Sequence, residues 1–425
     1  MHELVIRGAE QDIAVDDGLI SAIGPELAAG RREIDARALA VLPGVIDVHV
    51  HFNEPGRSDW EGAATGSRAF AAAGGTLYFD MPLNSSPCTV NAKAFDEKCA
   101  ALSKASVTDF GLWGGIIPGN RGELAELAAR GVIGFKAFMS DSGLAEFPRS
   151  DDLTLYEGMC EAARLGLPVS VHAESEEITR GMAKRFLAAG RCAVRDYLDS
   201  RPVIAEVEAI GRAALLAKEA GAKLHIVHIS SGRGIAAALE ARARGTDISL
   251  ETCPHYLAFT DEDMERIGAV AKCAPPLRTH AEQKQLWDAV IDGSVDIIGS
   301  DHSPAPPEMK QGDNFFRIWG GIAGIQATLP VLLERLRPAR IADLVAGNPA
   351  RRFSLPRKGR IAVGCDADFA LVDMRQGWVM ERETLLQRHR ISPYIGRTFR
   401  GRVVQTILRG QTGCDTNGRL VRPRA

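Results

Sequence analysis

Two histidines in the first eighth of the chain have the spacing of a metal site. His49 and His51 close an apolar run that begins at Gly44 and reads Gly-Val-Ile-Asp-Val-His-Val-His. Side chains two apart on a β-strand project to the same side, so both imidazoles would point together from the end of such a strand. Two neutral imidazoles can share one metal ion, although such pairs also occur as ordinary buried histidines. The pair therefore predicts metal-assisted chemistry only if further ligands lie beside it.

Strands and helices that could position such ligands are predicted between about residues 44 and 336. In this region β-rich runs alternate with amphipathic helical stretches. This alternation implies parallel pairing, and eight units over about 290 residues predict an α/β fold with a closed (β/α)8 TIM-like barrel. An open doubly wound sheet is the alternative, but no Gly-x-Gly-x-x-Gly follows the first strand to support it. The strands are expected at residues 45–51, 76–81, 110–116, 132–138, 168–172, 223–228, 247–252 and 295–300.

The two ends of the chain are predicted to form a separate β-domain. Residues 3–41 and 359–410 carry short alternating segments that are typical of small antiparallel β units. The economical arrangement is one small β-sandwich that both ends build beside the barrel. The predicted domains are residues 1–43 for the N-terminal part of the sandwich, 44–355 for the barrel and 356–425 for the C-terminal part.

Other residues that can bind metal fall at the C-terminal ends of the expected barrel strands. His172 ends the fifth strand, His228 ends the sixth, and Asp301 follows directly on the eighth. In a barrel this face carries the active site, so residues distant in sequence converge there. With the first two histidines they supply four nitrogens and a carboxylate, which is more than one catalytic zinc ion uses beside its open position. Two divalent metal ions are therefore predicted.

Lys136 lies near the end of the fourth expected strand, between Phe135 and Phe138, at the level of the histidines. An ammonium group that faces a metal pair is electrostatically unfavourable. If burial and nearby cations keep the amine neutral, carbon dioxide can add to it and give a carbamate that could bridge two metals. The other interpretation, which the spacing alone favours, is a lysine whose stem packs on the two phenylalanines while its ammonium reaches water.

Composition and charge argue against several classes of function. The chain carries 51 basic and 54 acidic side chains, for a formal net charge of -3, so no broad field attracts nucleic acid or an anionic membrane. No secretory signal and no apolar run of membrane-spanning length, about 18 residues, are present in the sequence. Eight cysteines are scattered without a Cys-x-x-Cys pair, unlike a disulfide framework or a thiolate zinc site. We expect a soluble cytoplasmic protein with reduced thiols, and neither nucleic acid nor membrane as a partner.

Five stretches, in order along the chain, carry a resemblance to a known family. They are residues 43–57 (PGVIDVHVHFNEPGR), 80–87 (DMPLNSSP), 253–256 (CPHY), 300–304 (SDHSP) and 319–324 (WGGIAG). This set resembles the cyclic amidohydrolases of the amidohydrolase superfamily, and within them the allantoinase family. The matched stretches extend across most of the chain. The resemblance reverses the preference at Lys136 toward the carbamate.

The resemblance implies a distorted barrel with the two-ended β-sandwich and a binuclear metal centre. It assigns His49, His51 and Asp301 to one metal, and His172 and His228 to the other. It assigns Lys136, carboxylated by carbon dioxide, to the bridge between them. The implied reaction is hydrolysis of the hydantoin ring amide of allantoin to allantoate by a metal-bridging hydroxide. Asp301 would act as general base and then as general acid toward the leaving nitrogen. Zinc is the expected metal, while cobalt, manganese and nickel also suit these ligands. A homo-oligomer is implied as well, with a tetramer expected.

Three positions separate the chain from families that share this metal centre. Dihydroorotases typically place an arginine where Asn53 stands, and dihydropyrimidinases and hydantoinases usually carry a tyrosine where Asp141 stands. The latter also tend to show Pro-Asn-Gly in place of Trp319-Gly320-Gly321. These differences favour the allantoinase family, while dihydropyrimidinase, hydantoinase or dihydroorotase activity on another cyclic ureide stays the alternative. A catalytically inactive scaffold is a further alternative, which a missing ligand would indicate, and no ligand is missing from the sequence.

Four residues in the motif loops are candidates for binding the small-molecule substrate: Asn53, Asn84, Ser303 and Gly320. The three polar side chains could hydrogen-bond ureido or ring amides, or could instead cap a helix or brace a turn. Gly320 and its neighbour Gly321 could let the backbone approach a ligand closely, or could serve a turn that needs positive φ.

Overall fold

Eight parallel strand positions form a barrel in the computed structural model, which describes residues 1–8, 11–412 and 416–424. β8 and β9 are two halves of the third position, separated by Trp113, and each other position is one strand. The barrel strands are β6 (Val45–Val50), β7 (Gly75–Asp80), β8 (Asp109–Leu112), β9 (Gly114–Gly115), β10 (Phe135–Phe138), β11 (Val169–His172), β12 (Leu224–Ile226), β13 (Ile248–Thr252) and β14 (Ile297–Ile298). All eight predicted strands are present at the expected places in the chain.

The first and last strand positions meet and close the barrel. Beyond the end of β14, the backbone N–H of Ser300 donates to the Asp47 carboxylate in β6 (3.0 Å). Farther along, Val50 forms a parallel bridge with His302, and His51 N donates to His302 O (2.9 Å). The predicted (β/α)8 barrel is therefore confirmed, and the open sheet is excluded.

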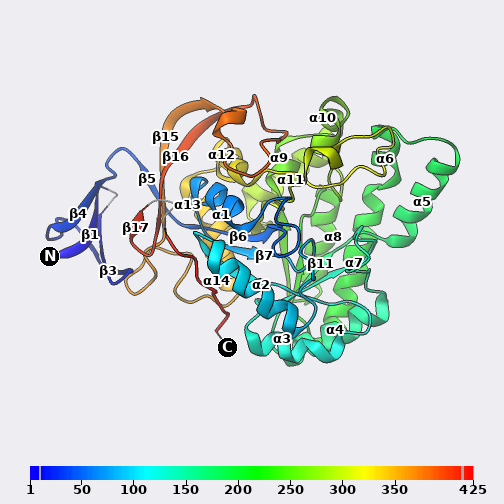
Figure 1. Ribbon diagram of the computed structural model, residues 1–425, viewed down its shortest axis with the longest axis horizontal. Coiled ribbons are helices and arrows are strands. Elements are labelled where there is room, and N and C mark those ends of the chain that lie inside the picture. The colour runs from blue at the N-terminus through cyan, green and yellow to red at the C-terminus, as the bar shows by residue number, and fades with distance from the viewer. Residues whose placement is uncertain (9–10, 413–415, 425) are drawn as a thin grey trace.

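Helices connect the strands and cover the outside of the barrel (Figure 1). They are α1 (Ala63–Ala72), α2 (Ala92–Ala105), α3 (Leu124–Arg130), α4 (Asp152–Arg164), α5 (Glu176–Ala188), α6 (Val194–Ser200), α7 (Val203–Ala220), α8 (Gly232–Ala243), α9 (Pro254–Ala258), α10 (Asp261–Ile267), α11 (His280–Asp292), α12 (Thr328–Leu333), α13 (Pro338–Ala342) and α14 (Asn348–Arg352). Local sequence sets several of their ends. Asn91 and Ser231 cap α2 and α8 by accepting backbone N–H bonds. Gly221 ends α7 in the left-handed conformation, φ 67°.

The barrel strands are buried on both faces. Every residue of β6, β7, β11 and β13 is buried, as expected for parallel strands between a filled barrel interior and a layer of helices. Such strands are rich in apolar residues, so a titratable side chain within them has few neighbours that can solvate it. The histidines and the lysine at the strand ends are therefore in an environment that favours their neutral forms.

Both chain ends contribute to a β-domain at one end of the molecule. One sheet contains β1 (His2–Arg7), β2 (Asp12–Asp16), β3 (Leu19–Gly24) and β4 (Gly30–Asp35), and the other contains β5 (Ala40–Pro43), β15 (Phe369–Val379), β16 (Thr398–Leu408) and β17 (Gln411–Thr412). A shared hydrophobic core joins Leu4 and Ile13 of the first sheet to Phe369 and Ile407 of the second. Figure 1 shows β15 and β16 between the first sheet and the barrel. The expectation of purely antiparallel units is wrong for the first sheet, since β4 pairs in parallel with β1.

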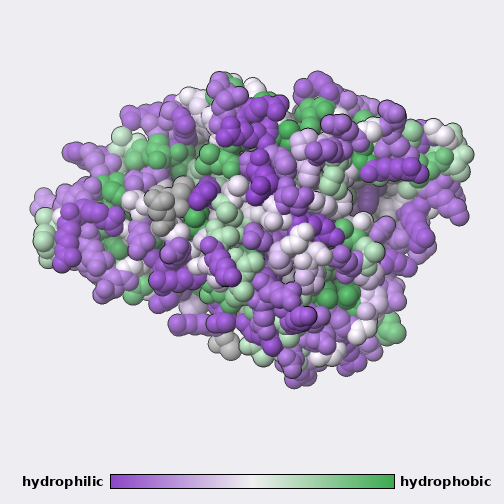
Figure 2. Space-filling model, in the orientation of Figure 1, coloured by the Kyte–Doolittle hydropathy of each residue, from purple (hydrophilic) through white to green (hydrophobic). Residues whose placement is uncertain are grey.

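The polarity of the surface and the state of the cysteines match what the composition predicts. Hydrophilic residues cover most of the face shown in Figure 2, with hydrophobic ones in small groups among them. Among the described residues no helix is both long and apolar enough to cross a membrane. The seven cysteines in the described part of the chain are free thiols, and Cys414 lies outside the described residues. The domain limits at residues 43 and 355 stay predictions.

Candidate metal centre

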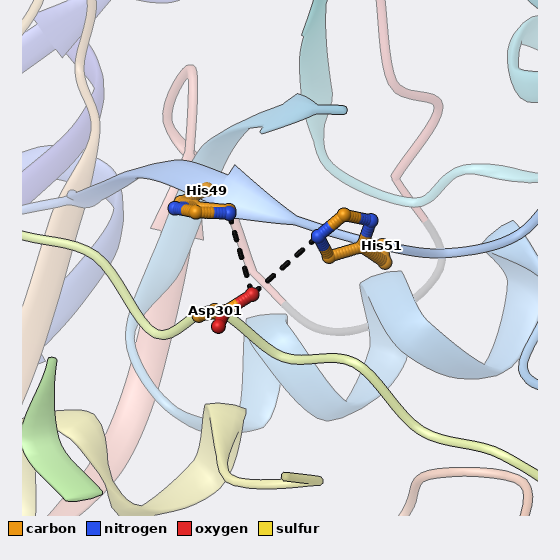
Figure 3. Close-up of side chains that lie close together, drawn as sticks. All are labelled: His49, His51 and Asp301. Atoms are coloured by element: carbon orange, nitrogen blue, oxygen red, sulfur yellow. Dashed lines mark ion pairs between the residues drawn. The ribbon is translucent and has the colours of Figure 1, made fainter. Parts of the chain in front are cut away.

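His49, His51 and Asp301 come together at the C-terminal end of the barrel strands. Figure 3 shows the two imidazoles, which come from β6 and the residue after it, on either side of the Asp301 carboxylate from the loop after β14. His49 Nε2 lies 3.3 Å from Asp301 Oδ1, and His51 Nε2 lies 3.4 Å from the same oxygen. Tetrahedral ligands at about 2.0–2.1 Å from a zinc ion stand about 3.3 Å apart. The three side chains therefore have the spacing of ligands to one divalent ion.

His172 and His228 form a second pair beside the first group. His172 Nδ1 faces His228 Nε2 at 3.0 Å, and the ring centroid of His228 lies 5.4 Å from that of His49. Burial lowers the pKa of His51, His172 and His228. These imidazoles are therefore neutral at pH 7, which is the form with a lone pair available to a metal.

Lys136 is completely buried in β10, and its Nζ atom has no hydrogen-bond partner. Nζ lies 5.0 Å from the centroid of the Phe138 ring, which stacks on His172 at 4.5 Å between centroids. Burial lowers the pKa of Lys136 to about 7, although the charges of Glu251 and Asp301 act in the opposite direction. The side chain does not reach water, so the interpretation that the spacing alone favours does not fit. A buried amine without a partner is costly unless it is neutral or modified.

Two of the predicted ligands have strained backbone conformations. His228 has φ 39° and Asp301 has φ 45°, in the left-handed region that residues with a Cβ atom adopt rarely. Each such residue costs about 1–3 kcal/mol and persists only where its surroundings hold it. Strain of this kind is concentrated at functional sites, and here it falls on two predicted ligands, each of which lies beside His49.

Two buried glutamates that were not predicted as site residues form hydrogen bonds with two of the histidines. Glu251 Oε1 accepts a hydrogen bond from His49 Nδ1, and Glu174 Oε2 accepts one from His172 Nε2, both at 2.9 Å. Burial alone would raise the pKa of Glu251, but His49 and His225 lower it to about 2. A signal was present in the sequence, since Glu174 follows His172 by two residues and Glu251 lies within the strand expected at residues 247–252.

A cavity of about 930 Å³ opens onto the four histidines and Asp301. Three of the four candidate substrate contacts line it, namely Asn84, Ser303 and Gly320. Asn53 is not among the lining residues, and its Nδ2 atom donates to Pro304 O (3.4 Å). The amide of Asn84 also lies 3.2 Å from His51 Nδ1, so it contacts both the cavity and a predicted ligand.

Two of the three positions that separate this chain from dihydroorotases and hydantoinases in sequence, Asp141 and the segment 319–321, also line the cavity, whereas Asn53 does not. Asp141 accepts a hydrogen bond from Gly143 N (3.0 Å), which closes a tight turn at the cavity wall. Gly321 has φ 140°, and a Cβ atom there would collide with the backbone oxygen of Ser303, so this glycine serves the close turn. Gly320 has open space where a Cβ would lie, which leaves room for a ligand beside its backbone.

Two lysines hold the segment 315–321, which forms part of the cavity wall. Lys272 Nζ donates to Phe315 O (2.6 Å), and Lys310 Nζ donates to Trp319 O (3.0 Å) and Gly321 O (2.6 Å). Each ammonium is satisfied by backbone carbonyls, so this wall is fixed by its own hydrogen bonds. Neither lysine was predicted from the sequence to have a role in the site.

The chain is similar to known proteins over its whole length. A family model described as "Amidohydrolase family" matches residues 40–413. An allantoinase from Solibacter usitatus is 64% identical over 447 residues, which cover 100% of this chain and 98% of the relative. An allantoinase from Rubrobacter xylanophilus is 57% identical and covers 99% of this chain and 96% of its own. A solved structure described as L-hydantoinase (dihydropyrimidinase) from Arthrobacter aurescens has a TM-score of 0.95 at 33% identity, covering 100% of this chain and 98% of its own.

Proposed function

The chain belongs to the amidohydrolase family, and we propose that it hydrolyses the hydantoin ring amide of allantoin to give allantoate. The observation that supports this substrate assignment most strongly is the 64% identity to an allantoinase, which covers 100% of this chain and 98% of the relative. A cavity that has both polar and apolar lining residues and ends at the histidine cluster suits a small, uncharged ureide. The cluster itself supplies the ligands for metal-assisted hydrolysis.

The donor set fits two divalent metal ions. It combines four buried imidazoles, a carboxylate and a buried amine without a partner. We assign His49, His51 and Asp301 to one ion, His172 and His228 to the other, and carboxylated Lys136 to both. Such ions, when bound, polarise a scissile carbonyl and lower the pKa of a bound water from 15.7 toward about 7. Zinc is the expected metal, and the same ligand types accept cobalt, manganese or nickel.

Carboxylation explains why Lys136 is buried without a partner. The neutral Nζ amine adds to the carbon of carbon dioxide and loses one proton, which gives an anionic carbamate. An amine with a pKa near 7 is partly in the reactive, uncharged form at neutral pH. The change replaces a cation among metal ligands by a carboxylate-like anion with two oxygens. These oxygens would be suitable ligands for divalent ions.

Asp301 is placed to move the proton during the reaction. It lines the cavity and lies against the rings of His49 and His51. Although burial opposes it, these imidazoles hold the pKa of Asp301 below its usual range, so the carboxylate is ionised and can accept a proton. Asp301 takes a proton from the attacking water and passes it to the ring nitrogen as the carbon–nitrogen bond breaks. The water oxygen becomes part of the new carboxylate.

The substrate assignment predicts a clear order of reactivity. At equal enzyme concentration we expect allantoin to be hydrolysed at least about tenfold faster than dihydroorotate, dihydrouracil or hydantoin. The reason is that Asn53, Asp141 and the segment from Trp319 to Gly321 depart from the patterns of the enzymes for those rings. Product formation from the four compounds is the measurement.

Each alternative has its own outcome in this assay. A preference for dihydrouracil or hydantoin would favour the second candidate, which the likeness to solved hydantoinases supports at the level of the fold. A preference for dihydroorotate would likewise replace the substrate and leave the metal chemistry intact. No turnover of any of the four by metal-loaded protein would favour the inactive scaffold. A cytoplasmic location stays a prediction from the composition, and a homotetramer stays a prediction from the resemblance.

A further inference from the structure

One buried carboxylate connects His49 to a second histidine deeper in the barrel. Glu251 Oε1 accepts hydrogen bonds from His49 Nδ1 (2.9 Å) and from the backbone N–H of His228 (3.2 Å). Its other oxygen, Oε2, accepts from His225 Nε2 (2.9 Å). His225 Nδ1 lies 2.8 Å from the hydroxyl of Ser249. A continuous series of hydrogen bonds therefore ties β6, β12 and β13 together beneath the metal centre.

We propose that Glu251 is a positioning residue that decides which nitrogen of His49 faces the metal, and that His225 holds Glu251 in place for this role. The inference rests on the proposed function, because it concerns a ligand of the proposed metal centre. A carboxylate that accepts from Nδ1 keeps the ring proton on that nitrogen. His49 Nε2 then keeps its lone pair and faces Asp301 at 3.3 Å.

The location of this group argues against a direct role in substrate binding. Glu251 and His225 are both 0% exposed, and neither is among the residues that line the cavity. Stability alone gives little reason to keep such a group, since buried ionic contacts can often be replaced by well-packed apolar residues without loss. A role in orienting the metal ligand His49 does explain why Glu251 and His225 are buried side by side here.

Glu174 contacts His172 in a similar way but offers a less clean test. Its Oε2 atom also lies 3.3 Å from Arg201 Nη1, and Arg201 lines the cavity. A change at Glu174 would therefore alter the cavity wall as well as the orientation of His172. Within the described part of the chain, Glu251 forms side-chain hydrogen bonds with two cavity-lining residues, His49 and His228, so its effect can be separated.

The test is the affinity of the metal-free protein for Zn²⁺, measured in competition with a chromogenic chelator. We expect Glu251→Gln, which keeps the size but replaces an acceptor oxygen by an amide NH2, to weaken Zn²⁺ binding at one site by roughly 10–100-fold. Zn²⁺ should also raise the unfolding temperature of this variant less than that of the unmodified protein, because stabilisation by a ligand follows its affinity.

Glu206→Gln is the matched control. Glu206 is 1% exposed and accepts hydrogen bonds from the backbone N–H and hydroxyl of Ser230 (both 2.8 Å), but it contacts no ring of a predicted ligand. This variant also places a buried glutamine amide in the protein, but away from the predicted ligands. Its Zn²⁺ affinity should stay within about threefold of that of the unmodified protein, even if its metal-free form is less stable. Equal Zn²⁺ affinity in Glu251→Gln and Glu206→Gln would overturn the proposal.

A second variant decides the matter if Glu251→Gln does not fold. His225→Phe keeps a ring but removes the donor to Glu251 Oε2, so we expect weaker Zn²⁺ binding with His49 and Glu251 both present. Unchanged affinity in His225→Phe would then refute the role of this pair. Unmodified protein that binds no Zn²⁺ would instead contradict the proposed function itself, which distinguishes the two failures.

Discussion

Lys136→Ala is expected to lower the turnover of allantoin by at least about 10³-fold, or about 4 kcal/mol of transition-state stabilisation. The variant lacks the only side chain assigned to both metals, and its two groups of histidines lose their common anion. Short-chain carboxylates such as acetate or propionate should restore part of the activity. They fit because the substitution removes a long buried side chain and leaves space beside the histidines. The measurement is kcat at rising carboxylate concentration.

Lys98→Ala is the control for this rescue. Lys98 is also buried, but its Nζ atom donates to Met81 O (2.6 Å) and lies 3.1 Å from Asp80 Oδ2. Its loss should destabilise the protein, and added carboxylate should not increase the activity of the variant. Full activity in Lys136→Ala, or equal response of both variants to acetate, would contradict a bridging carbamate.

Asp301→Asn is expected to lower kcat by about 10²–10⁴-fold, the usual contribution of a proton-transferring group. The amide has nearly the same shape and keeps one oxygen near His49 and His51, so the loss should fall mainly on kcat rather than on KM. An amide cannot accept the proton of the attacking water at neutral pH. Steady-state kinetics together with metal analysis of the variant separate these effects. A variant that retains both metals and near-normal kcat would remove Asp301 from the proton transfer.

The barrel and the candidate metal ligands could be predicted from the sequence because both leave local signals. Strands buried on two faces give short apolar runs, and eight of these at regular intervals limit the possible folds. His172 and Asp301 were predictable as neighbours of His49, since the ends of parallel strands meet at one face of a barrel. The structure places them within one cluster.

The partners of these side chains could not be predicted in the same way. Glu251 contacts His49 across 202 positions of sequence, and which of many acids reaches a given ring depends on strand register and side-chain direction. Asn53 belongs to the same motif as His51, yet it does not line the cavity, and its side chain donates to Pro304 O. Pairing direction is also non-local, which is why the parallel contact between β1 and β4 was not foreseen.

We propose that this chain hydrolyses allantoin with two metal ions held by one cluster of six side chains. Metal analysis of the purified, active protein tests it most directly, with allantoin turnover measured on the same sample. We expect close to two divalent ions per chain, and activity that is lost with a chelator and regained with Zn²⁺. A metal content near zero in protein with full activity would contradict it.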